Sequence, residues 1–379
     1  MRSLIKSIKN NAIMYISGIL AVISCFIITP DKKYIGYINV RVLSILFCLM
    51  LIVAALVRIG TFDLLTGKLL KKIRTLRGIS LLLTILSFFL SMFLTNDVTL
   101  VTLVPFAIMV LTPFEKPREL MYTLIIMTVA ANLGSMQTPV GNPQNLYLYE
   151  TYGLSLPSFL LLMLPYSAFS LLLTFILVFI LIRDNKPLEE PSKRDLKAVS
   201  IPKLLIYIAL FILNIMTVAG FIHFLISLAA TAVIILIIDR RSFKNVDYQL
   251  LLTFVFFFVL IGNIGRIDAV TSRLSGLVSE HPVPAAILSS QIISNVPAAM
   301  LLSAFTSDGK SLVIGTNLGG LGTIIASMAS LITYKFHSAI AYKDSISNKK
   351  GKQSSYLASF TLINVAVLAL LFGLFLIIG

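Results

Sequence analysis

Long apolar runs follow one another along the chain and are separated by short polar connectors. A helix needs about 20 apolar residues to cross a hydrocarbon core about 30 Å thick, and several runs approach that length. The pattern predicts membrane crossings over these ranges: 11–30, 39–59, 119–145, 156–182, 204–219, 222–238, 248–265, 312–334 and 355–378. The longest polar connectors, 183–203 and 335–354, are short loops. We therefore expect an all-α polytopic membrane protein with a single transmembrane domain over residues 1–379.

The charge distribution gives this topology a direction. The chain is 58% hydrophobic and 12% charged, whereas soluble domains carry about 25% charged residues. Its net charge of +15 does not indicate a nucleic-acid partner, because the basic residues lie in loops between apolar runs. Of 31 Lys and Arg residues, 25 fall on one side of the predicted topology and 6 on the other. The positive-inside rule then places the N-terminus in the cytoplasm and the C-terminus outside, with the plasma membrane as the expected location.

Two further apolar stretches, 79–112 and 282–305, do not fit this topology as single crossings, because each must enter and leave on one side. The second has about 12 residues per limb, which reach roughly 18 Å as helix and are too short to cross twice. It predicts a re-entrant helical hairpin with its tip at 294–296. The longer first stretch also allows two ordinary crossings, but symmetry with the second favours a hairpin with its tip at 95–97.

The chain contains a weak internal repeat. Segment 131–139, ANLGSMQTP, resembles segment 316–324, TNLGGLGTI, and the hairpin tips Thr95-Asn96 and Ser294-Asn295 correspond as well. The residues that match at a shift of 185 are Asn132, Leu133, Gly134 and Thr138 with Asn317, Leu318, Gly319 and Thr323. We expect repeat 1 over 11–182, a linker helix at 204–219 and repeat 2 over 222–379. Each repeat has an odd number of crossings, so the second is inverted, which is a transporter architecture.

Helix-breaking residues lie inside two of the apolar runs. Segment 131–145 contains Gly134, Pro139, Gly141 and Pro143, and proline removes a helix donor while glycine permits unusual backbone angles. We expect the helices to open over 133–143 and 318–323, facing the hairpin tips. Freed carbonyls suit hard cations, and helix N-termini favour anions. The alternative is that the glycines only let helices pack closely.

Apart from Glu119, which is the first residue of segment 119–145, Asp97 is the one carboxylate within the apolar segments. A charge near the middle of a bilayer is costly and is usually functional. Asp97 can bind a cation or take up a proton, and the alternative is a cap on its own helix. Enzymatic chemistry is not expected, because no second buried acid accompanies Asp97 and the three histidines are scattered.

The runs LTNDVTLVTLVPFAI (94–108), ANLGSMQTPVGNPQN (131–145) and SNVP (294–297) resemble the ion transporter superfamily. This group contains citrate and dicarboxylate carriers, arsenite permeases and some sodium/proton antiporters. The resemblance implies a homodimer, a scaffold domain, a moving transport domain and elevator-type alternating access. Dicarboxylate carriers have Ser-Asn-Thr tips, whereas the third positions here are Asp97 and Val296. An acid beside a polyanion is unfavourable unless it is protonated or bound to a cation, so arsenite-type or antiporter chemistry stays open.

The motifs and the resemblance together predict two overlapping sites. The predicted substrate-binding residues are Thr95, Asn96, Thr138, Pro139, Asn142, Ser294, Asn295 and Thr323. The predicted coupling residues are Asp97, Asn96, Asn132, Gly134, Asn295, Asn317 and Gly319, where sodium is the expected metal if a proton is not used. No other cofactor is expected. The predicted function is secondary active transport of a small anionic solute, with arsenite permease-like efflux or sodium/proton antiport as alternatives and a passive channel less favoured.

Overall fold

The computed structural model describes residues 12–61, 73, 75–184, 199–267, 276, 278–344 and 349–378. This part of the chain is almost entirely helical and contains no strand. The helices that are long and apolar enough to cross a membrane are Val40–Arg58, Leu76–Leu94, Leu156–Leu181, Ile201–Val218 and the 356–378 part of the last helix. These findings confirm the predicted all-α polytopic membrane protein. The basic residues in 1–11, 62–72 and 185–198, which contribute to the predicted orientation, lie outside the described residues.

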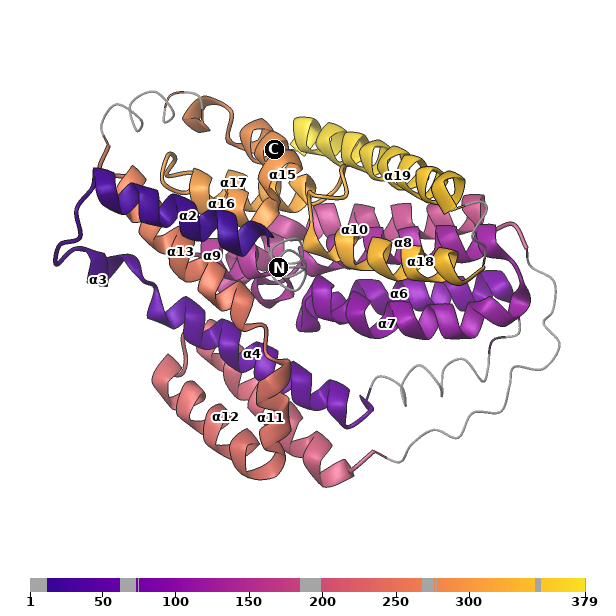
Figure 1. Cartoon of the computed structure of the whole chain (residues 1–379), viewed down its shortest axis with the longest axis horizontal. Helices are drawn as coiled ribbons and strands as arrows, with labels where there is room; N and C mark the ends of the chain where they lie inside the picture. Colours follow the sequence, from indigo (N-terminus) through magenta and orange to yellow (C-terminus); the bar gives the residue numbers. More distant parts are fainter. Residues whose placement is uncertain are drawn as a thin grey trace.

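The helices form two bundles (Figure 1). The small bundle consists of α2 (Ala12–Ile27), α3 (Tyr34–Tyr37), α4 (Val40–Arg58), α11 (Ile201–Val218), α12 (Phe224–Asp239), η3 (Arg240–Asn245) and α13 (Tyr248–Ile264). Within it α2 packs along α13, while α4 packs against α11 and α12. Its outer surface is rich in exposed Ile, Leu and Phe, as expected for helices that face lipid.

The large bundle contains both predicted hairpins and both predicted helix breaks (Figure 1). Its elements are α6 (Leu76–Leu94), α7 (Asn96–Leu111), η1 (Thr112–Phe114), α8 (Pro117–Ser135), η2 (Pro139–Gly141), α9 (Pro143–Thr151), α10 (Leu156–Leu181), α15 (Pro282–Ile293), α16 (Asn295–Leu302), α17 (Gly309–Gly319), α18 (Met328–Asp344) and α19 (Lys349–Ile378). The closest packing is between α6 and α8 and between α15 and α17. Each pair joins the first limb of a hairpin to a helix that ends at a break.

The two bundles meet along an extended apolar border, where one buried cluster contains residues of α4, α9, α13 and α16. Helix α4 contacts α6 and α9, and α13 contacts α16. The ion pair between Arg41 Nε and Glu150 Oε2, 2.9 Å apart, is the only ion pair between the bundles among the described residues. Beside it, the Tyr149 hydroxyl donates to the carbonyl of Val218 at 3.0 Å. Few polar contacts therefore hold one bundle against the other.

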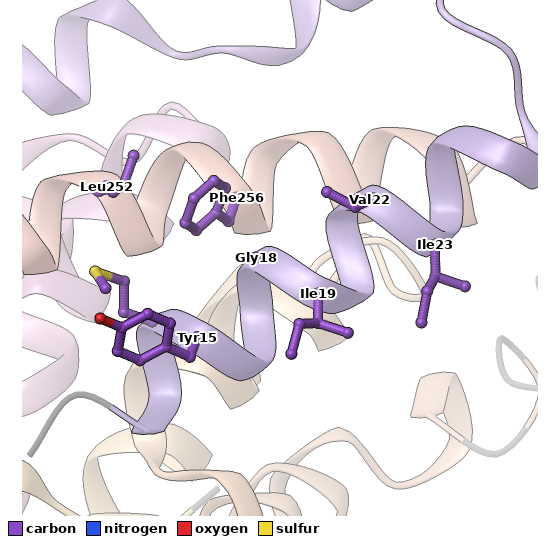
Figure 2. Close-up of a pocket in the computed structure, with 8 residues that line it drawn as sticks. Tyr15, Gly18, Ile19, Val22, Ile23, Leu252 and Phe256 are labelled. Atoms are coloured by element: carbon purple, nitrogen blue, oxygen red, sulfur yellow. The ribbon is translucent and has the colours of Figure 1, made fainter. Parts of the chain in front are cut away.

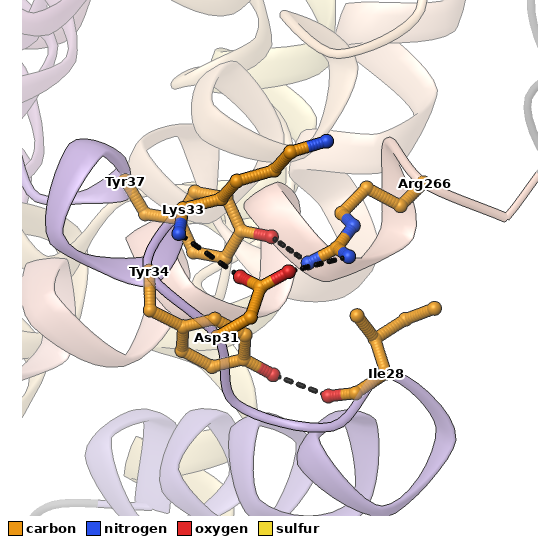
Figure 3. A network of polar contacts seen from close by, with 6 residues as sticks. All are labelled: Ile28, Asp31, Lys33, Tyr34, Tyr37 and Arg266. Carbon is orange, nitrogen blue, oxygen red and sulfur yellow. Dashed lines mark hydrogen bonds and ion pairs between the residues drawn. The ribbon is translucent and has the colours of Figure 1, made fainter.

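A polar cluster connects the loop after α2 to the end of α13 (Figure 3). Asp31 forms an ion pair with Arg266 at 2.8 Å, and Arg266 also donates to the Tyr37 hydroxyl at 3.0 Å. Burial acts to raise the pKa of Asp31, but its bonds to Arg266 and to the Lys33 amide outweigh burial and place the pKa below its ordinary value. These contacts fix the ends of α2 and α13 and lie far from the helix breaks.

Each predicted hairpin is a pair of helices joined by a single residue. The turns are Thr95, with φ 71° and ψ 151°, and Ser294, with φ 73° and ψ 155°. One residue in this sparsely populated region reverses the chain, at a typical cost of about 1–3 kcal/mol. The predicted tips 95–97 and 294–296 were therefore too long, because Asn96 and Asn295 already begin the second limbs. Whether the hairpins are re-entrant in the membrane stays a prediction.

Both predicted broken helices are broken, at slightly different places than expected. The first break covers 136–142 between α8 and α9, and the second covers 320–327 between α17 and α18. The predictions of 133–143 and 318–323 were wrong at their ends, because Gly134 and Gly319 still belong to helices. A Cβ at Gly134 would collide with the carbonyl of Phe88, and one at Gly319 would lie 2.6 Å from Ser290 Oγ. These glycines permit close helix packing, which was the alternative interpretation.

Candidate functional site

The first hairpin tip meets both breaks through a cluster of buried side chains. Asn96 Nδ2 donates to Asn132 Oδ1 at 2.8 Å and lies 3.4 Å from Ser327 Oγ. Ser327 Oγ also donates to Asn132 Oδ1 at 3.1 Å, and Asn132 Nδ2 lies 3.4 Å from the carbonyl of Gly320. Helix α7, the end of α8 and the second break therefore converge on one point in the large bundle.

The second hairpin tip reaches the same place from the other side. The backbone amide of Asn295 donates to the carbonyl of Ala326 at 3.0 Å, and Ser294 Oγ lies 3.4 Å from that carbonyl. Asn295 Nδ2 packs against Gly320, where a Cβ would lie 3.0 Å away. Because Ala326 and Ser327 are neighbours, the two tips contact adjacent residues of the second break.

A direct amide contact joins the two predicted repeats. Asn317 Nδ2 donates to Asn145 Oδ1 at 2.7 Å and to the carbonyl of Val313 at 2.7 Å. Asn145 Nδ2 in turn donates to the carbonyls of Ser135 and Thr138 at 3.3 and 3.2 Å. Both asparagines are buried. The amide of Asn145 thus holds the first break closed on itself while its oxygen connects that break to α17.

Among the described residues of this region, the Oδ1 atoms of Asn142, Asn317 and Asp97 are buried and accept no hydrogen bond. Buried polar atoms without a partner are uncommon and indicate a strained, ligand-binding or functional position. No three His, Cys, Asp or Glu side chains gather in the described residues. A cation at this site would therefore be held by amide and carbonyl oxygens together with one carboxylate, as hard cations prefer.

Helix ends of both polarities point to the site. Helices α8 and α17 end at Ser135 and Gly319, so their partly negative C-termini lie beside the breaks. Helices α7, α9 and α16 begin at Asn96, Pro143 and Asn295 with partly positive N-termini. Such an arrangement can stabilise a cation and an anion next to each other, without any basic side chain.

Asp97 lies in the first turn of α7, where the helix dipole favours a negative charge. The next residue, Val98, packs against an apolar cluster of the small bundle that includes Val246. Asp247, at the start of α13, is the charged group that acts on Asp97 electrostatically. Asp97 is therefore placed on the tip where the large bundle borders the small one.

The other predicted site residues have structural contacts of their own. Thr138 Oγ1 donates to the carbonyl of Met92 and accepts from the amide of Gly141, and Thr323 Oγ1 donates to the carbonyl of Gln291 at 3.3 Å. Pro139 begins η2, and Asn142 Nδ2 donates to Ser135 Oγ at 2.6 Å. These residues surround the tips, but part of their hydrogen-bonding capacity is used to hold the breaks.

Sequence reasoning missed two residues, Gln291 and Ser327. Gln291 is the one long amide in the first limb of the second hairpin, PVPAAILSSQII, and this signal could have identified it. Ser327 carries no motif, because its position depends on how far the second break extends. An apolar groove of about 460 Å³ between α2 and α13 is unrelated to the site, since it is lined by residues such as Ile19, Val22 and Phe256 (Figure 2). It lacks the convergent polar groups of a solute site.

Comparison with known proteins identifies the class. The family model described as citrate transporter matches residues 4–310. An uncharacterized transporter of Methanocaldococcus jannaschii is 34% identical over 324 residues, which are 85% of this chain and 88% of that protein. The inner membrane protein YbiR of Escherichia coli is 29% identical over 316 residues, 83% of this chain and 84% of its own. The silicon efflux transporter LSI3 of rice, Oryza sativa, is 30% identical over 148 residues, 39% of this chain and 30% of its own.

These matches confirm the resemblance that the tip and GNPQN motifs carried. They agree with a multi-pass membrane protein whose polar groups converge inside one helical bundle. The chain belongs to the citrate transporter family, and it is a membrane transporter.

Proposed function

We propose that this protein is a secondary active transporter that moves a small anionic solute, coupled to sodium or protons, by elevator-type alternating access. The observation that carries the proposal is that Asn96, Asn132 and Ser327 bind one another, while Asn295 packs against Gly320, whose carbonyl Asn132 approaches. Helix C-termini and N-termini point to the same place. A cation and an anion can therefore bind together, which couples the movement of one to the other.

The division into bundles supports the elevator mechanism. Every residue of the proposed site belongs to the large bundle, so that bundle can move as a unit without dismantling the site. The small bundle would stay fixed in the membrane and, by the family resemblance, form the homodimer. The contacts between Arg41 and Glu150 and between Tyr149 and Val218 would break during the motion. We further propose a plasma-membrane location with the N-terminus in the cytoplasm and the C-terminus outside.

Contacts within the large bundle also support inverted repeats. Thr138 binds the carbonyl of Met92, three residues before the turn at Thr95. Thr323 binds the carbonyl of Gln291, three residues before the turn at Ser294. The same contact thus recurs at matching positions in the two halves of the chain.

The chemistry at the third tip position favours a second candidate function. Asp97 presents a buried carboxylate oxygen without a hydrogen-bond partner, where a di- or tricarboxylate carrier would avoid a negative charge. Arsenite permease-like efflux or sodium/proton antiport does not require the site to exclude a negative charge. The rice relative is named as a silicon efflux transporter, and this supports efflux as the direction of transport. A passive channel is less well supported, and saturable, gradient-dependent flux would separate a carrier from it.

The coupling proposal is tested by Asp97→Asn in proteoliposomes. The variant keeps the side-chain shape and one side-chain oxygen, but it loses the charge that binds a cation or proton. We expect the pH or sodium dependence of transport to flatten while the protein still folds. Uptake and efflux of citrate, arsenite and silicic acid are measured across a pH series, with and without a sodium gradient.

Asp308→Asn is the matched control. Asp308 lies at the N-cap of α17 in the large bundle, and its Oδ1 accepts from the Ser311 amide at 3.0 Å. Asn caps nearly as well as Asp at such a position, so this variant should transport like the unmodified protein. Unchanged ion dependence in Asp97→Asn would remove Asp97 from the coupling site and leave it as a structural residue.

A further inference from the structure

Met92 and Gln291 occupy corresponding places in the two hairpins. Each lies three residues before the single-residue turn, and the backbone carbonyl of each accepts a hydrogen bond from a threonine of the adjacent break. Their side chains differ in chemistry, because the methionine side chain has no N–H group and the glutamine side chain has two. Both residues lie beside opened backbone, where a cation would bind.

The amide of Gln291 binds the second break through several backbone groups. Its Nε2 donates to the carbonyls of Gly319 at 3.0 Å and Leu321 at 2.9 Å, and also lies 3.2 Å from the carbonyl of Ile287. Its Oε1 accepts from the amide of Thr323 at 2.9 Å. Gly322 has φ +107°, and a Cβ there would collide with the Gln291 side chain. The backbone of the second break is shaped around this one amide.

The first break has no such contact from its hairpin. By the shift of 185, the counterparts of the Gly319 and Leu321 carbonyls are those of Gly134 and Met136. In the described part of the chain, neither of these two carbonyls accepts a side-chain hydrogen bond, although Gly134 accepts one from the backbone amide of Gln137. The side-chain donor of the first break, Asn145, instead binds Ser135 and Thr138.

We propose that Gln291 is a positioning residue that takes the place of a cation at the second break, so that the coupling ion is confined to the first repeat. Freed carbonyls at a broken helix are the groups that hold a sodium ion in transporters. At Gly319 and Leu321 they are bound by the amide instead. This inference rests on the proposed function for its meaning in coupling, but its test does not require transport.

The test is the replacement Gln291→Glu, which keeps size and shape. It exchanges the two N–H donors for a carboxylate oxygen that faces the carbonyls of Gly319 and Leu321. Those oxygens repel one another until a small cation binds between them. We expect the detergent-purified variant to melt several degrees below the unmodified protein in choline chloride, and to recover in sodium or lithium chloride.

Gln137→Glu is the matched control. Gln137 also lies in an opened segment, but its Nε2 donates to the Leu160 carbonyl of α10 at 2.9 Å and its Oε1 accepts from Ser167. This variant should lose stability without recovering in either salt. If the two Glu variants respond alike to cations, or if Gln291→Glu melts like the unmodified protein in all salts, the proposal is wrong.

Gln291→Met keeps the proposal testable if Gln291→Glu does not fold. It places the residue of the first repeat in the second and frees the two carbonyls without adding a charge. We expect a lower melting temperature in choline and partial recovery in sodium. A melting temperature equal to that of the unmodified protein in both salts would overturn the proposal. Absence of transport by the unmodified protein would count against the proposed function and leave these melting results unaffected.

Discussion

The first and second breaks occupy equivalent places in the chain but are held by different chemistry. The first contains Pro139 in a short η2 helix and is closed by the amide of Asn145, which comes from the helix that follows. The second is rich in glycine and is held by Gln291, which comes from the preceding hairpin. The equivalent Asn-Leu-Gly segments thus set where the helices end, while local side chains determine what the opened backbone can bind.

The largest difference is expected between the two packing glycines, Gly134 and Gly319. A Cβ at Gly134 would collide with the backbone carbonyl of Phe88, which cannot rotate away. A Cβ at Gly319 would meet mainly the Ser290 side chain, with Oγ at 2.6 Å and Cβ at 2.8 Å. Overpacking a core typically lowers the free energy of unfolding by about 1–3 kcal/mol, and occasionally by more. We expect Gly134→Ala to reach or exceed this range and Gly319→Ala to fall at its lower end. Thermal melting of the purified variants measures the difference.

A double replacement sharpens this first prediction. Ser290→Gly removes the two nearest atoms that a Cβ at Gly319 would meet and leaves only the Ala286 carbonyl at 3.1 Å, so Ser290→Gly with Gly319→Ala should recover much of the stability lost in Gly319→Ala. Because the two residues are in contact, their effects should not add. Ser91→Gly should not rescue Gly134→Ala to the same extent, since the carbonyl of Phe88 remains. If both double variants recovered stability to the same extent, the contacts at Gly134 and Gly319 would be equally tight, and the predicted difference between them would be wrong.

The second prediction compares the matching asparagines Asn132 and Asn317. Asn132 Oδ1 accepts from both Asn96 and Ser327, whereas Asn317 donates to Asn145 and to its own helix. Asn132→Ala should therefore reduce transport more strongly, because it separates the first hairpin tip from the second break. Each buried group left without a partner costs about 1–3 kcal/mol. Initial uptake rates and melting temperatures of both variants provide the measurement.

Asn364→Ala controls for the loss of any buried asparagine. Asn364 is buried in α19, and its Nδ2 donates to the Phe360 carbonyl of the same helix at 2.8 Å. We expect a modest change in melting temperature and no change in ion dependence. If Asn317→Ala impaired transport more than Asn132→Ala, the functional centre would lie nearer the Asn145–Asn317 contact than the first tip.

Much of this architecture was predictable because apolar length and helix-breaking residues act locally. Every predicted crossing contains a helix, and both breaks occur where glycines, accompanied by prolines in the first break, interrupt an apolar run. The repeat also shows that Asn132 and Asn317 are corresponding residues. The prediction that Gly134 and Gly319 lie in opened backbone was wrong, because the sequence alone does not show whether a glycine interrupts its own helix or permits another helix to pack closely against it. Gln291 and Ser327 were missed, since their contacts depend on how distant segments pack.

The smallest predicted effect compares Thr138 and Thr323, which bind the two breaks to the two hairpins. Thr138 Oγ1 makes two contacts, with the carbonyl of Met92 and the amide of Gly141. Thr323 Oγ1 makes one longer contact of 3.3 Å, and its backbone amide is held separately by Gln291. A hydrogen bond contributes about 0.5–1.5 kcal/mol net. Thr138→Val should therefore lower the stability of the protein roughly twice as much as Thr323→Val, as measured by thermal melting. The control variants Thr138→Ser and Thr323→Ser keep the hydroxyl, so their melting temperatures should stay near that of the unmodified protein. Equal losses in the two Val variants would mean that Gln291 contributes nothing to holding Thr323, and the contrast between the two breaks would then rest on the glycines alone.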